Sequence, residues 1–410
     1  MSPDYDVIVV GARCAGATTA MLLARKGYRV LAVDRATFPS DTVSTHMIQA
    51  PGVALLKQWG LLEPVVAAGT PPIEKYTFDF GFQSGSVRLA GTARMPDGFC
   101  TAYAPRRTIL DKILVDAAAA AGAEIREGFN VDSLVVESGQ VVGIRGSSGG
   151  GASVVERARL VVGADGRGSR VARTVAAEQY NYHPKGQYQY YSYWRDLPIE
   201  GFEVVIRPGR VWAAQPTNDG LTMLAVAWPI DEKNAYRADI EGNYLRTLEL
   251  SPEFAERVRA ATRVEPFVGA GVENYFRKPY GPGWALVGDA AYNKDPITAL
   301  GITDAFRGAE LLAAAIDQTY TGAAGFDAAM AEYQRIRDTR NTEVFEHTAH
   351  LAQLEPASAD FERLVRAMQG NQEAIDQFSG INAGLVSPAD FFDPANVDRI
   401  LATSTTAVNR

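Results

Sequence analysis

The chain opens with a short apolar run, a glycine-containing turn, a stretch of small residues and a second apolar run. Residues 7–10 suit a buried parallel strand, residues 18–24 a helix that packs closely on a sheet, and residues 28–33 a second strand ending at Asp34. Strand, turn, helix and strand in this order make a βαβ unit. The pattern therefore predicts an α/β fold built around residues 5–34.

Two other patterns follow along the chain. Between about 181 and 275, and over 73–92, apolar and aromatic residues alternate with polar ones, which predicts antiparallel strands. An amphipathic helix is predicted to follow Arg107, and residues 131–145 are predicted to form a hairpin. Helical periodicity covers residues 302–318, 326–349 and 358–404, with breaks expected at Gly370, Gly380 and Pro388.

Together these patterns predict an α/β protein with a Rossmann-like βαβ domain, an inserted antiparallel β-sheet domain and C-terminal helices. The expected boundaries are 1–72, 99–180 and 276–345 for the nucleotide-binding domain, 73–98 and 181–275 for the β-sheet domain, and 346–410 for the helical segment.

Composition narrows the classes of function. The chain has 410 residues, 47% apolar and 21% charged, with a net charge of −8, which argues against nucleic acid as a partner. No apolar run is long enough for an integral membrane segment, and two isolated cysteines fit a reducing, cytoplasmic location. His347 and His350 are three residues apart on a predicted helix, but no second ligand cluster accompanies them, so we expect no metal site.

The turn after the first strand carries the spacing of a dinucleotide-binding fingerprint. Gly11 and Gly16 bracket it, and Asp34 ends the second strand, where a carboxylate can hold a ribose. The usual middle glycine is replaced by Arg13, which either offers charge to a phosphate or points to solvent. The alternative is an ordinary βαβ unit with a glycine-rich turn. The predicted nucleotide contacts here are Gly11, Ala12, Arg13, Ala15, Gly16, Asp34 and Arg35.

Two distant segments add to this fingerprint, VVGADGRGSRVAR at 161–173 and WALVGDAAYNKDPITALGITDAFRGAELL at 284–312. In order and spacing, the three segments resemble the signatures of FAD-dependent monooxygenases of the p-hydroxybenzoate hydroxylase fold. That superfamily also contains flavin-dependent halogenases and geranylgeranyl reductases. The resemblance spans about residues 5–312.

The resemblance implies roles for residues outside the fingerprint. Asp165 and Gly166 match the Asp-Gly signature associated with flavin and nicotinamide binding, and Asp289 matches the ligand of the flavin ribityl chain. Arg107, with Leu110 and Asp111, matches an arginine that pairs with flavin phosphate. The alternatives are helix caps for both aspartates and a solvated helix start for Arg107. Further implied cofactor contacts are Thr45, Gly288, Pro296, Gly301 and Ile302.

The sequence also departs from family patterns. Tyr292 stands where many hydroxylases have histidine, and the halogenases' W-x-W-x-I-P stretch is absent. Lys294 is a halogenase-type lysine by location only, and a surface lysine is the better interpretation.

Three residues are candidates for catalysis: His46, Tyr193 and Trp212. The resemblance places the segment containing His46 beside the flavin ring, and a loop histidine bonded to backbone is the equal alternative. Tyr191, Tyr193, Trp212 and Trp228 would line an apolar substrate wall, although for each one core packing is the better interpretation.

The resemblance implies an FAD-dependent monooxygenase, with a role in secondary metabolism. It would use NAD(P)H and O2 to hydroxylate or epoxidise an aromatic or polyketide-like small molecule through a flavin C4a-hydroperoxide. The alternatives are a C=C reductase of geranylgeranyl reductase type, a halogenase served by a separate flavin reductase, and a flavoprotein without enzymatic activity.

Overall fold

The computed structural model describes residues 3–408, and its first large sheet carries the βαβ unit. Its strand order is β19-β20-β10-β1-β2-β7, in which the strands from β20 to β7 run parallel. β9 pairs with the first half of β10 and forms a hairpin with β8. The strands are β1 (Tyr5–Val10), β2 (Val30–Val33), β7 (Glu124–Arg126), β8 (Phe129–Glu137), β9 (Gln140–Ser148), β10 (Val154–Gly163), β19 (Tyr280–Gly281) and β20 (Trp284–Leu286).

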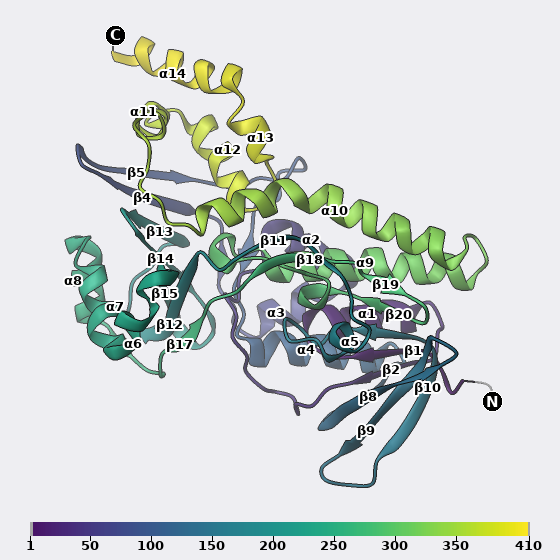
Figure 1. The fold of residues 1–410 in the computed structure, drawn as a ribbon. Coiled ribbons are helices and arrows are strands. Elements are labelled where there is room, and N and C mark those ends of the chain that lie inside the picture. Colours follow the sequence, from purple (N-terminus) through teal and green to yellow (C-terminus); the bar gives the residue numbers. More distant parts are fainter. Residues whose placement is uncertain (1–2, 409–410) are drawn as a thin grey trace.

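Both faces of this sheet are covered, which explains why β1 is a continuous apolar run. Val7 and Val9 pack in the layer of α1, α4 and α9, whereas Ile8 and Val10 pack with the β8–β9 hairpin and α5. α10 lies along α9 on the outside of that helical layer (Figure 1). The helices are α1 (Cys14–Arg25), α4 (Arg107–Ala120), α5 (Arg170–Thr174), α9 (Gly301–Tyr320) and α10 (Phe326–Leu351).

The second large sheet is mostly antiparallel and combines segments that are distant in sequence. Its order is β16-β12-β15-β14-β13-β4-β5, with β17 also paired to β12. β13 and β4 pair in parallel, which brings the segment after residue 73 into the sheet of the later strands. The strands are β4 (Tyr76–Phe82), β5 (Gly85–Gly91), β12 (Gln187–Arg195), β13 (Phe202–Arg207), β14 (Arg210–Pro216), β15 (Leu221–Pro229), β16 (Thr262–Arg263) and β17 (Val268–Ala270). The predicted α/β architecture with a second, antiparallel sheet is therefore confirmed; the exact domain boundaries stay a prediction.

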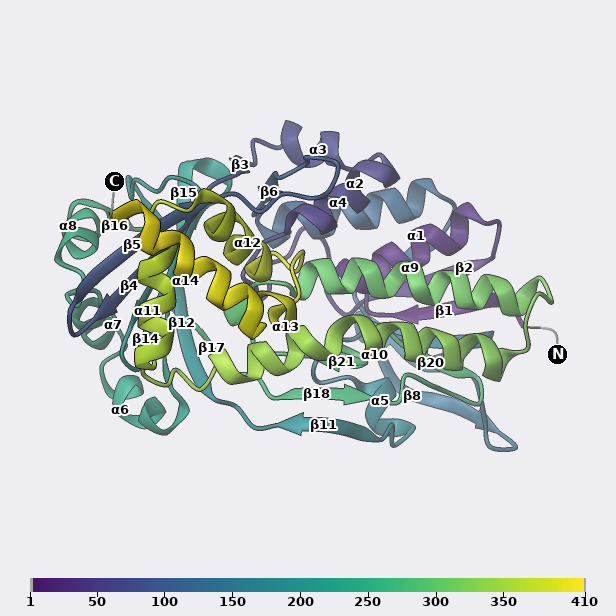
Figure 2. The same ribbon diagram turned by 90° about the horizontal axis from the view of Figure 1, so that it is seen from above.

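The C-terminal helices cover the face of β4 and β5 that carries alternating phenylalanines (Figure 2). They are α11 (Ala359–Met368), α12 (Gln372–Asn382), α13 (Pro388–Phe391) and α14 (Pro394–Val408). Gly370 and Pro388 mark breaks as predicted, but the predicted break at Gly380 is wrong. A Cβ on Gly380 would lie 2.6 Å from the Val386 side chain, so this glycine permits close packing inside α12, and the chain turns at Gly384 with φ of 67°.

Shorter elements connect the two sheets and cover the outer face of the second. They are α2 (Ala50–Trp59), α3 (Leu62–Ala67), β3 (Pro72–Ile73), β6 (Ala102–Tyr103), β11 (Gln179–His183), η1 (Asn218–Gly220), η2 (Ile230–Glu232), α6 (Lys233–Ala238), α7 (Ile240–Leu248), α8 (Pro252–Ala260), β18 (Asn274–Arg277), η3 (Gly288–Ala290), β21 (Tyr292–Asn293) and η4 (Pro296–Thr298). Over the described residues 3–408, none of the helices combines the length and apolar character needed to span a bilayer.

Candidate functional site

The glycine turn after β1 is shaped by close backbone contacts. Gly11 has a φ of 96°, and a Cβ there would lie 2.5 Å from the carbonyl oxygen of Ala164. A Cβ on Gly16 would lie 1.8 Å from the carbonyl oxygen of Gly11. The start of α1 also contacts η3, since a Cβ on Gly288 would lie 2.7 Å from that of Ala15. Motifs far apart in sequence thus meet at the start of α1.

Asp34 lies at the end of β2, beside this turn. Its two carboxylate oxygens accept hydrogen bonds from the backbone amides of Ala12 and Ala36, each at 2.8 Å, and the side chain is buried. These bonds fix the carboxylate while leaving each oxygen able to accept another donor. Arg35, the next residue, is exposed. The position of Asp34 agrees with the sequence pattern, and its role as a ribose ligand stays a prediction.

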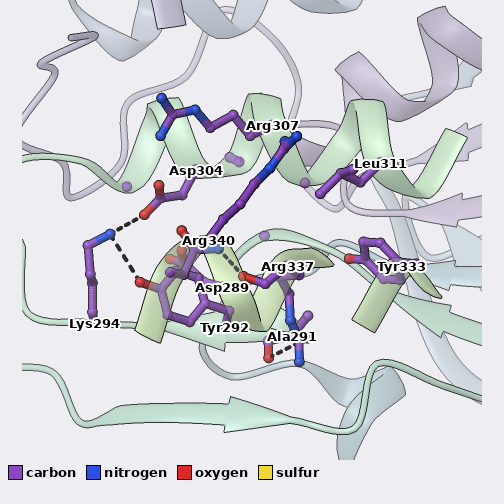
Figure 3. Close-up of a pocket in the computed structure, with 15 residues that line it drawn as sticks. Asp289, Ala291, Tyr292, Lys294, Asp304, Arg307, Leu311, Tyr333, Arg337 and Arg340 are labelled. Atoms are coloured by element: carbon purple, nitrogen blue, oxygen red, sulfur yellow. Dashed lines mark hydrogen bonds and ion pairs between the residues drawn. The ribbon is translucent and has the colours of Figure 1, made fainter. Parts of the chain in front are cut away.

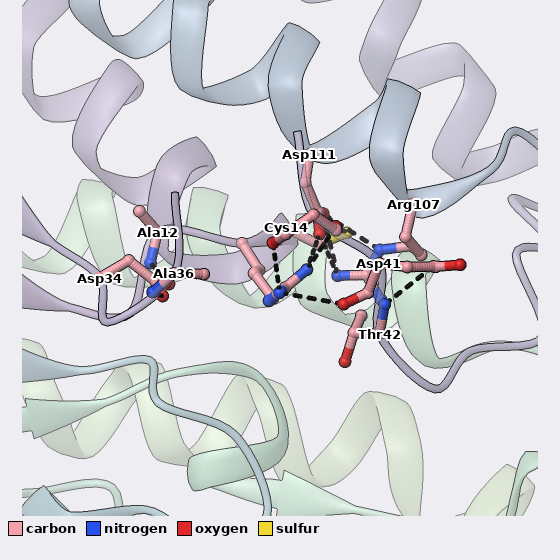
Figure 4. Close-up of polar contacts among 10 residues, drawn as sticks. Ala12, Cys14, Asp34, Ala36, Asp41, Thr42, Arg107 and Asp111 are labelled. Atoms are coloured by element: carbon pink, nitrogen blue, oxygen red, sulfur yellow. Dashed lines mark hydrogen bonds and ion pairs between the residues drawn. The ribbon is translucent and has the colours of Figure 1, made fainter. Parts of the chain in front are cut away.

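Arg13 belongs to a polar cluster around the buried Asp111, which we call the Asp111 cluster and which also contains Cys14 and Arg107. Figure 4 shows Cys14, Arg107 and Asp111 side by side. Arg13 donates to Asp111 at 2.6 Å and to the Ser40 hydroxyl at 2.9 Å. Arg107 donates to both oxygens of Asp111 at 2.9–3.0 Å, and the Cys14 thiol contacts the same carboxylate at 3.4 Å. The side chain of Arg13 is therefore held by bonds to the protein and is only partly exposed to solvent.

The contacts within the Asp111 cluster bear on the role of Arg107, which was expected to pair with a flavin phosphate, because this arginine is already bonded to Asp111. Its guanidinium is buried and two of its nitrogens already contact Asp111. Burial alone would lower the pKa of Arg107, but Cys14 and Asp111 raise it above its usual range, so the group is charged. The alternative of a solvated helix start is wrong, while the phosphate contact stays a prediction.

The carboxylate of Asp165 bonds to the first turn of α5, whose N-cap residue is Ser169. It accepts hydrogen bonds from the Ser169 hydroxyl at 2.5 Å and the Arg170 amide at 2.6 Å, next to the start of α5. Asp165 is therefore not the N-cap of α5, and the flavin contact implied for it stays a prediction. Gly166 follows with φ of 75° and open space where a Cβ would be. Arg167 is exposed and acts electrostatically on Asp289. Sequence reasoning missed Arg167, although it directly follows the Asp-Gly signature.

Asp289 stands in a recess of the protein. Its side chain is exposed to solvent, yet the surrounding protein raises the pKa of its carboxyl, an effect that Arg167 and Arg107 oppose. Val287, not Asp289, precedes η3, and no capping bond of Asp289 occurs among the described residues. The position fits a carboxylate that receives hydroxyl donors from a ligand.

The start of α9 lies next to η3, the element that contains Asp289. The residue before it, Leu300, provides no side-chain cap; Gly301 is exposed and Ile302 is buried. The Thr303 hydroxyl accepts a hydrogen bond from the Gln49 amide at 3.2 Å, which ties α9 to the start of α2. An uncapped helix start of this kind favours negative charge on a bound group.

A buried acid that sequence reasoning missed precedes Pro296. Asp295 caps η4 through the Ile297 amide at 3.0 Å and accepts a hydrogen bond from the Gln187 side chain on β12. Burial raises the pKa of Asp295 to about 7. The local signal was present, because aspartate before proline is itself typical of a helix start. The contact with Gln187 links the flavin-motif loop to the second sheet.

The structure brings two of the three catalytic candidates together. The Nε2 atom of His46 forms a short hydrogen bond with the hydroxyl of Tyr193, and both side chains are buried. His46 has φ of 59°, unusual for a residue with a side chain, and burial lowers the pKa of its ring to about 3. Arg106 stacks 3.8 Å from the Tyr193 ring centre, and the Thr45 carbonyl accepts a hydrogen bond from Gln215 at 2.7 Å. The ring of His46 is thus neutral, and its Nδ1 atom has no partner among the described residues.

Trp212 does not join this pair. It packs against Phe254 of α8, in the same core cluster as Trp228. Tyr191 and Tyr193 belong to a separate cluster, on the face of the second sheet that meets His46. The two tryptophans are therefore core residues, and only the tyrosines lie beside the candidate site.

The residues around the start of α1, η3 and the start of α9 suit a dinucleotide with a pyrophosphate. The two helix starts lack side-chain caps, the glycines permit close approach, and Arg13, Arg107 and Arg167 supply positive charge. The fold and this site define a nucleotide-binding α/β protein.

Comparison with known proteins identifies the nucleotide class. Residues 4–348 match the FAD binding domain family, so the chain belongs to that family and is an FAD-dependent oxidoreductase.

The chain is 25% identical to a tryptophan 2-halogenase of Chondromyces crocatus (80% of this chain, 64% of that protein). It is 28% identical to a digeranylgeranylglycerophospholipid reductase of Methanocella arvoryzae (74% and 75%) and to 6-methylpretetramide 4-monooxygenase of Streptomyces rimosus (74% and 73%). The match thus spans less than two thirds of the halogenase. A flavoprotein/dehydrogenase structure from Cytophaga hutchinsonii has the same fold, with TM-score 0.82, 18% identity, and 98% and 99% of the two chains covered.

Proposed function

We propose that this protein is an FAD-dependent monooxygenase that uses NAD(P)H and O2 to hydroxylate or epoxidise an aromatic or polyketide-like small molecule. The observation that carries the proposal is the buried His46–Tyr193 pair. His46 belongs to the segment that Gln49 ties to α9, and Tyr193 belongs to the aromatic face of the second sheet, so the pair joins the two. A relative of this chain is named as a monooxygenase of 6-methylpretetramide.

FAD would be held by the α1 start, by Asp34 and Asp289, and by the amides at the start of α9. When bound, it supplies the redox chemistry, accepting a hydride and delivering electrons to oxygen. The uncapped start of α9 would stabilise negative charge on the bound ring system.

The His46–Tyr193 pair would hold and move a proton at the substrate. Because burial keeps the imidazole neutral, the Nε2 atom can share a proton with the tyrosine hydroxyl while Nδ1 stays available to a polar group. Tyr191 and Met223 add an apolar surface beside the pair, suited to a flat substrate that must be kept from water.

Halogenation is the less supported alternative. Lys294 is buried and paired with Asp304, which occupies its ammonium group. A C=C reductase is a second alternative, because a relative is named as a digeranylgeranylglycerophospholipid reductase and the apolar surface beside Tyr193 would also suit its substrate; the products would distinguish it from a monooxygenase.

The decisive experiment is anaerobic mixing of the purified, FAD-loaded protein with NADPH and with NADH. Loss of flavin absorbance near about 450 nm, followed by O2 uptake that matches oxygenated product, would support the proposal. Reduced product without O2 uptake would indicate a C=C reductase, and turnover that requires halide would indicate a halogenase. A protein that neither contains nor takes up FAD would overturn the proposal.

A further inference from the structure

A pocket lies between α9 and α10, on the side of η3 that faces these helices (Figure 3). Small residues of α9, including Gly301 and Gly308, form part of its wall and leave room between the helices. Its charged lining comprises four basic side chains and two carboxylates, namely Lys294, Arg307, Arg337, Arg340, Asp289 and Asp304. The lining is therefore positive in a chain whose net charge is −8.

Two of the basic side chains already have buried partners. Lys294 pairs with Asp304 and donates to the Tyr292 hydroxyl at 3.2 Å. Arg337 pairs with Asp338 at 2.7 Å and donates to the Tyr180 hydroxyl at 2.6 Å. The side chains of Lys294 and Arg337 are themselves buried, so we interpret them as a fixed part of the wall.

The other two basic side chains have no such partners. Within residues 3–408 neither Arg307 of α9, which is half-buried, nor Arg340 of α10, which is exposed, forms a hydrogen bond or an ion pair. Arg340 acts on Glu310 only at longer range. Burial raises the pKa of Glu310, Arg340 opposes this rise, and the Glu310 carboxylate accepts its hydrogen bond from Gln58. Figure 3 shows the Arg340 side chain extending toward α9, which carries Arg307. Two arginines from facing helices thus line one pocket.

We propose that this pocket binds a phosphate group of a small-molecule ligand, with Arg307 and Arg340 as its anion-binding pair. A guanidinium offers a planar set of donors that matches phosphate oxygens, and two of them on separate helices can hold one phosphate from two sides. The site is separate from the start of α1, where the FAD pyrophosphate is expected. Asp289 and Gly301 border both regions, so a ligand anchored here would reach toward the flavin.

Two ligands could supply the phosphate, the 2′-phosphate of NADPH or a phosphorylated substrate. The phosphate site itself does not require that the protein be a monooxygenase, whereas the assignment to NADPH rests on the proposed function. Binding is therefore measured first, without turnover.

The test uses FAD-loaded protein and inorganic pyrophosphate as the probe, with binding measured by titration calorimetry. The double variant Arg307→Gln/Arg340→Gln should bind pyrophosphate at least about tenfold more weakly and keep its FAD content. The matched control is Arg335→Gln, an exposed arginine of α10 paired only with Glu332, and it should bind as the parent does. Equal pyrophosphate affinity in the parent and the double variant would overturn the proposal.

The second measurement identifies the source of the phosphate. If the double variant loses affinity for NADPH and not for NADH, the site holds the 2′-phosphate of the dinucleotide. If pyrophosphate binding falls and both dinucleotides are unaffected, the site holds a phosphorylated substrate. A monooxygenase assay that fails while pyrophosphate binding depends on the two arginines would contradict the proposed function alone.

Discussion

The Asp111 cluster and the pair of His46 and Tyr193 are two polar groupings inside the protein, and they differ in how completely their atoms are hydrogen-bonded. In the Asp111 cluster both carboxylate oxygens receive donors from Arg13 and Arg107. In the pair of His46 and Tyr193 one hydrogen bond is made, and the Nδ1 atom of His46 stays without a partner among residues 3–408.

This difference in hydrogen bonding indicates which cluster has a structural role and which one is suited to bind a ligand. Most buried polar groups in folded proteins are hydrogen-bonded, so a satisfied cluster needs nothing more than the fold to explain it. A buried donor or acceptor without a partner costs stability unless a ligand completes it. We therefore interpret the Asp111 cluster as a support for the α1–α4 contact and His46–Tyr193 as a surface for substrate.

The largest effect is expected where the satisfied cluster is broken. Asp111→Ala removes the partner of the buried Arg107 guanidinium, whereas Arg13 keeps its bonds to Ser40, and the change should lower the free energy of unfolding by about 3–5 kcal/mol. Urea denaturation measures this loss. Asp116→Ala is the control, because Asp116 is an exposed residue of the same helix paired with Lys112, and it should cost less than about 1 kcal/mol. Similar losses in both variants would mean that the cluster carries little stability.

Tyr193→Phe should lower the free energy of unfolding less than Asp111→Ala does, and its main effect should be on activity. The change removes one hydroxyl and leaves the Nε2 atom of His46 without its bond, at a cost of about 1–3 kcal/mol. If the pair moves a proton, the rate of product formation should fall about 100-fold or more. Tyr191→Phe is the matched control, since Tyr191 lies beside the pair without bonding His46. Equal rates in the two variants would remove the pair from the mechanism.

Local parts of the site could be predicted from the sequence, and contacts between distant residues could not. The spacing of Gly11 and Gly16 and the position of Asp34 lie within one βαβ unit, so the residue order alone indicated them. The partners of Arg13 and His46 are 98 and 147 residues away along the chain. No periodicity encodes such contacts.

The same reason explains the outcome for the aromatic residues. Alternation along β12, β14 and β15 predicted strands correctly, but it does not say which of the two faces meets the flavin domain. The structure places Trp212 on the face covered by α8 and Tyr193 on the face toward His46. A strand's face is fixed by its neighbours in space, and here β4 joins the sheet from more than a hundred residues earlier.

The smallest effect is expected at Asp295. This residue tests whether a buried polar atom without a hydrogen-bond partner always indicates a ligand. Asp295 Oδ2 and Gln187 Oε1 both lack partners among the described residues, yet they belong to two side chains already in contact. A proton on Asp295 would give the pair a donor and make both oxygens part of one acid–amide contact. No charged side chain contributes to the pKa of Asp295, which burial raises from 3.8 to about 7.

The raised pKa gives the prediction a definite sign. Between about pH 4 and pH 7 the folded chain keeps a proton that the unfolded chain has lost, so the contribution of Asp295 to stability falls as the pH rises through this window. Asp295→Asn replaces the acid with a neutral amide of the same shape, which does not titrate. The variant should match the parent at pH 4 and be the more stable of the two at pH 8, measured by urea denaturation at both values. His46, with its lowered pKa, shifts stability in the opposite direction over the same acidic range, but it is common to both proteins and cancels in their difference. A variant that is less stable than the parent at pH 8 would mean that Asp295 acts as a carboxylate and that its free oxygen, like the Nδ1 atom of His46, awaits a ligand.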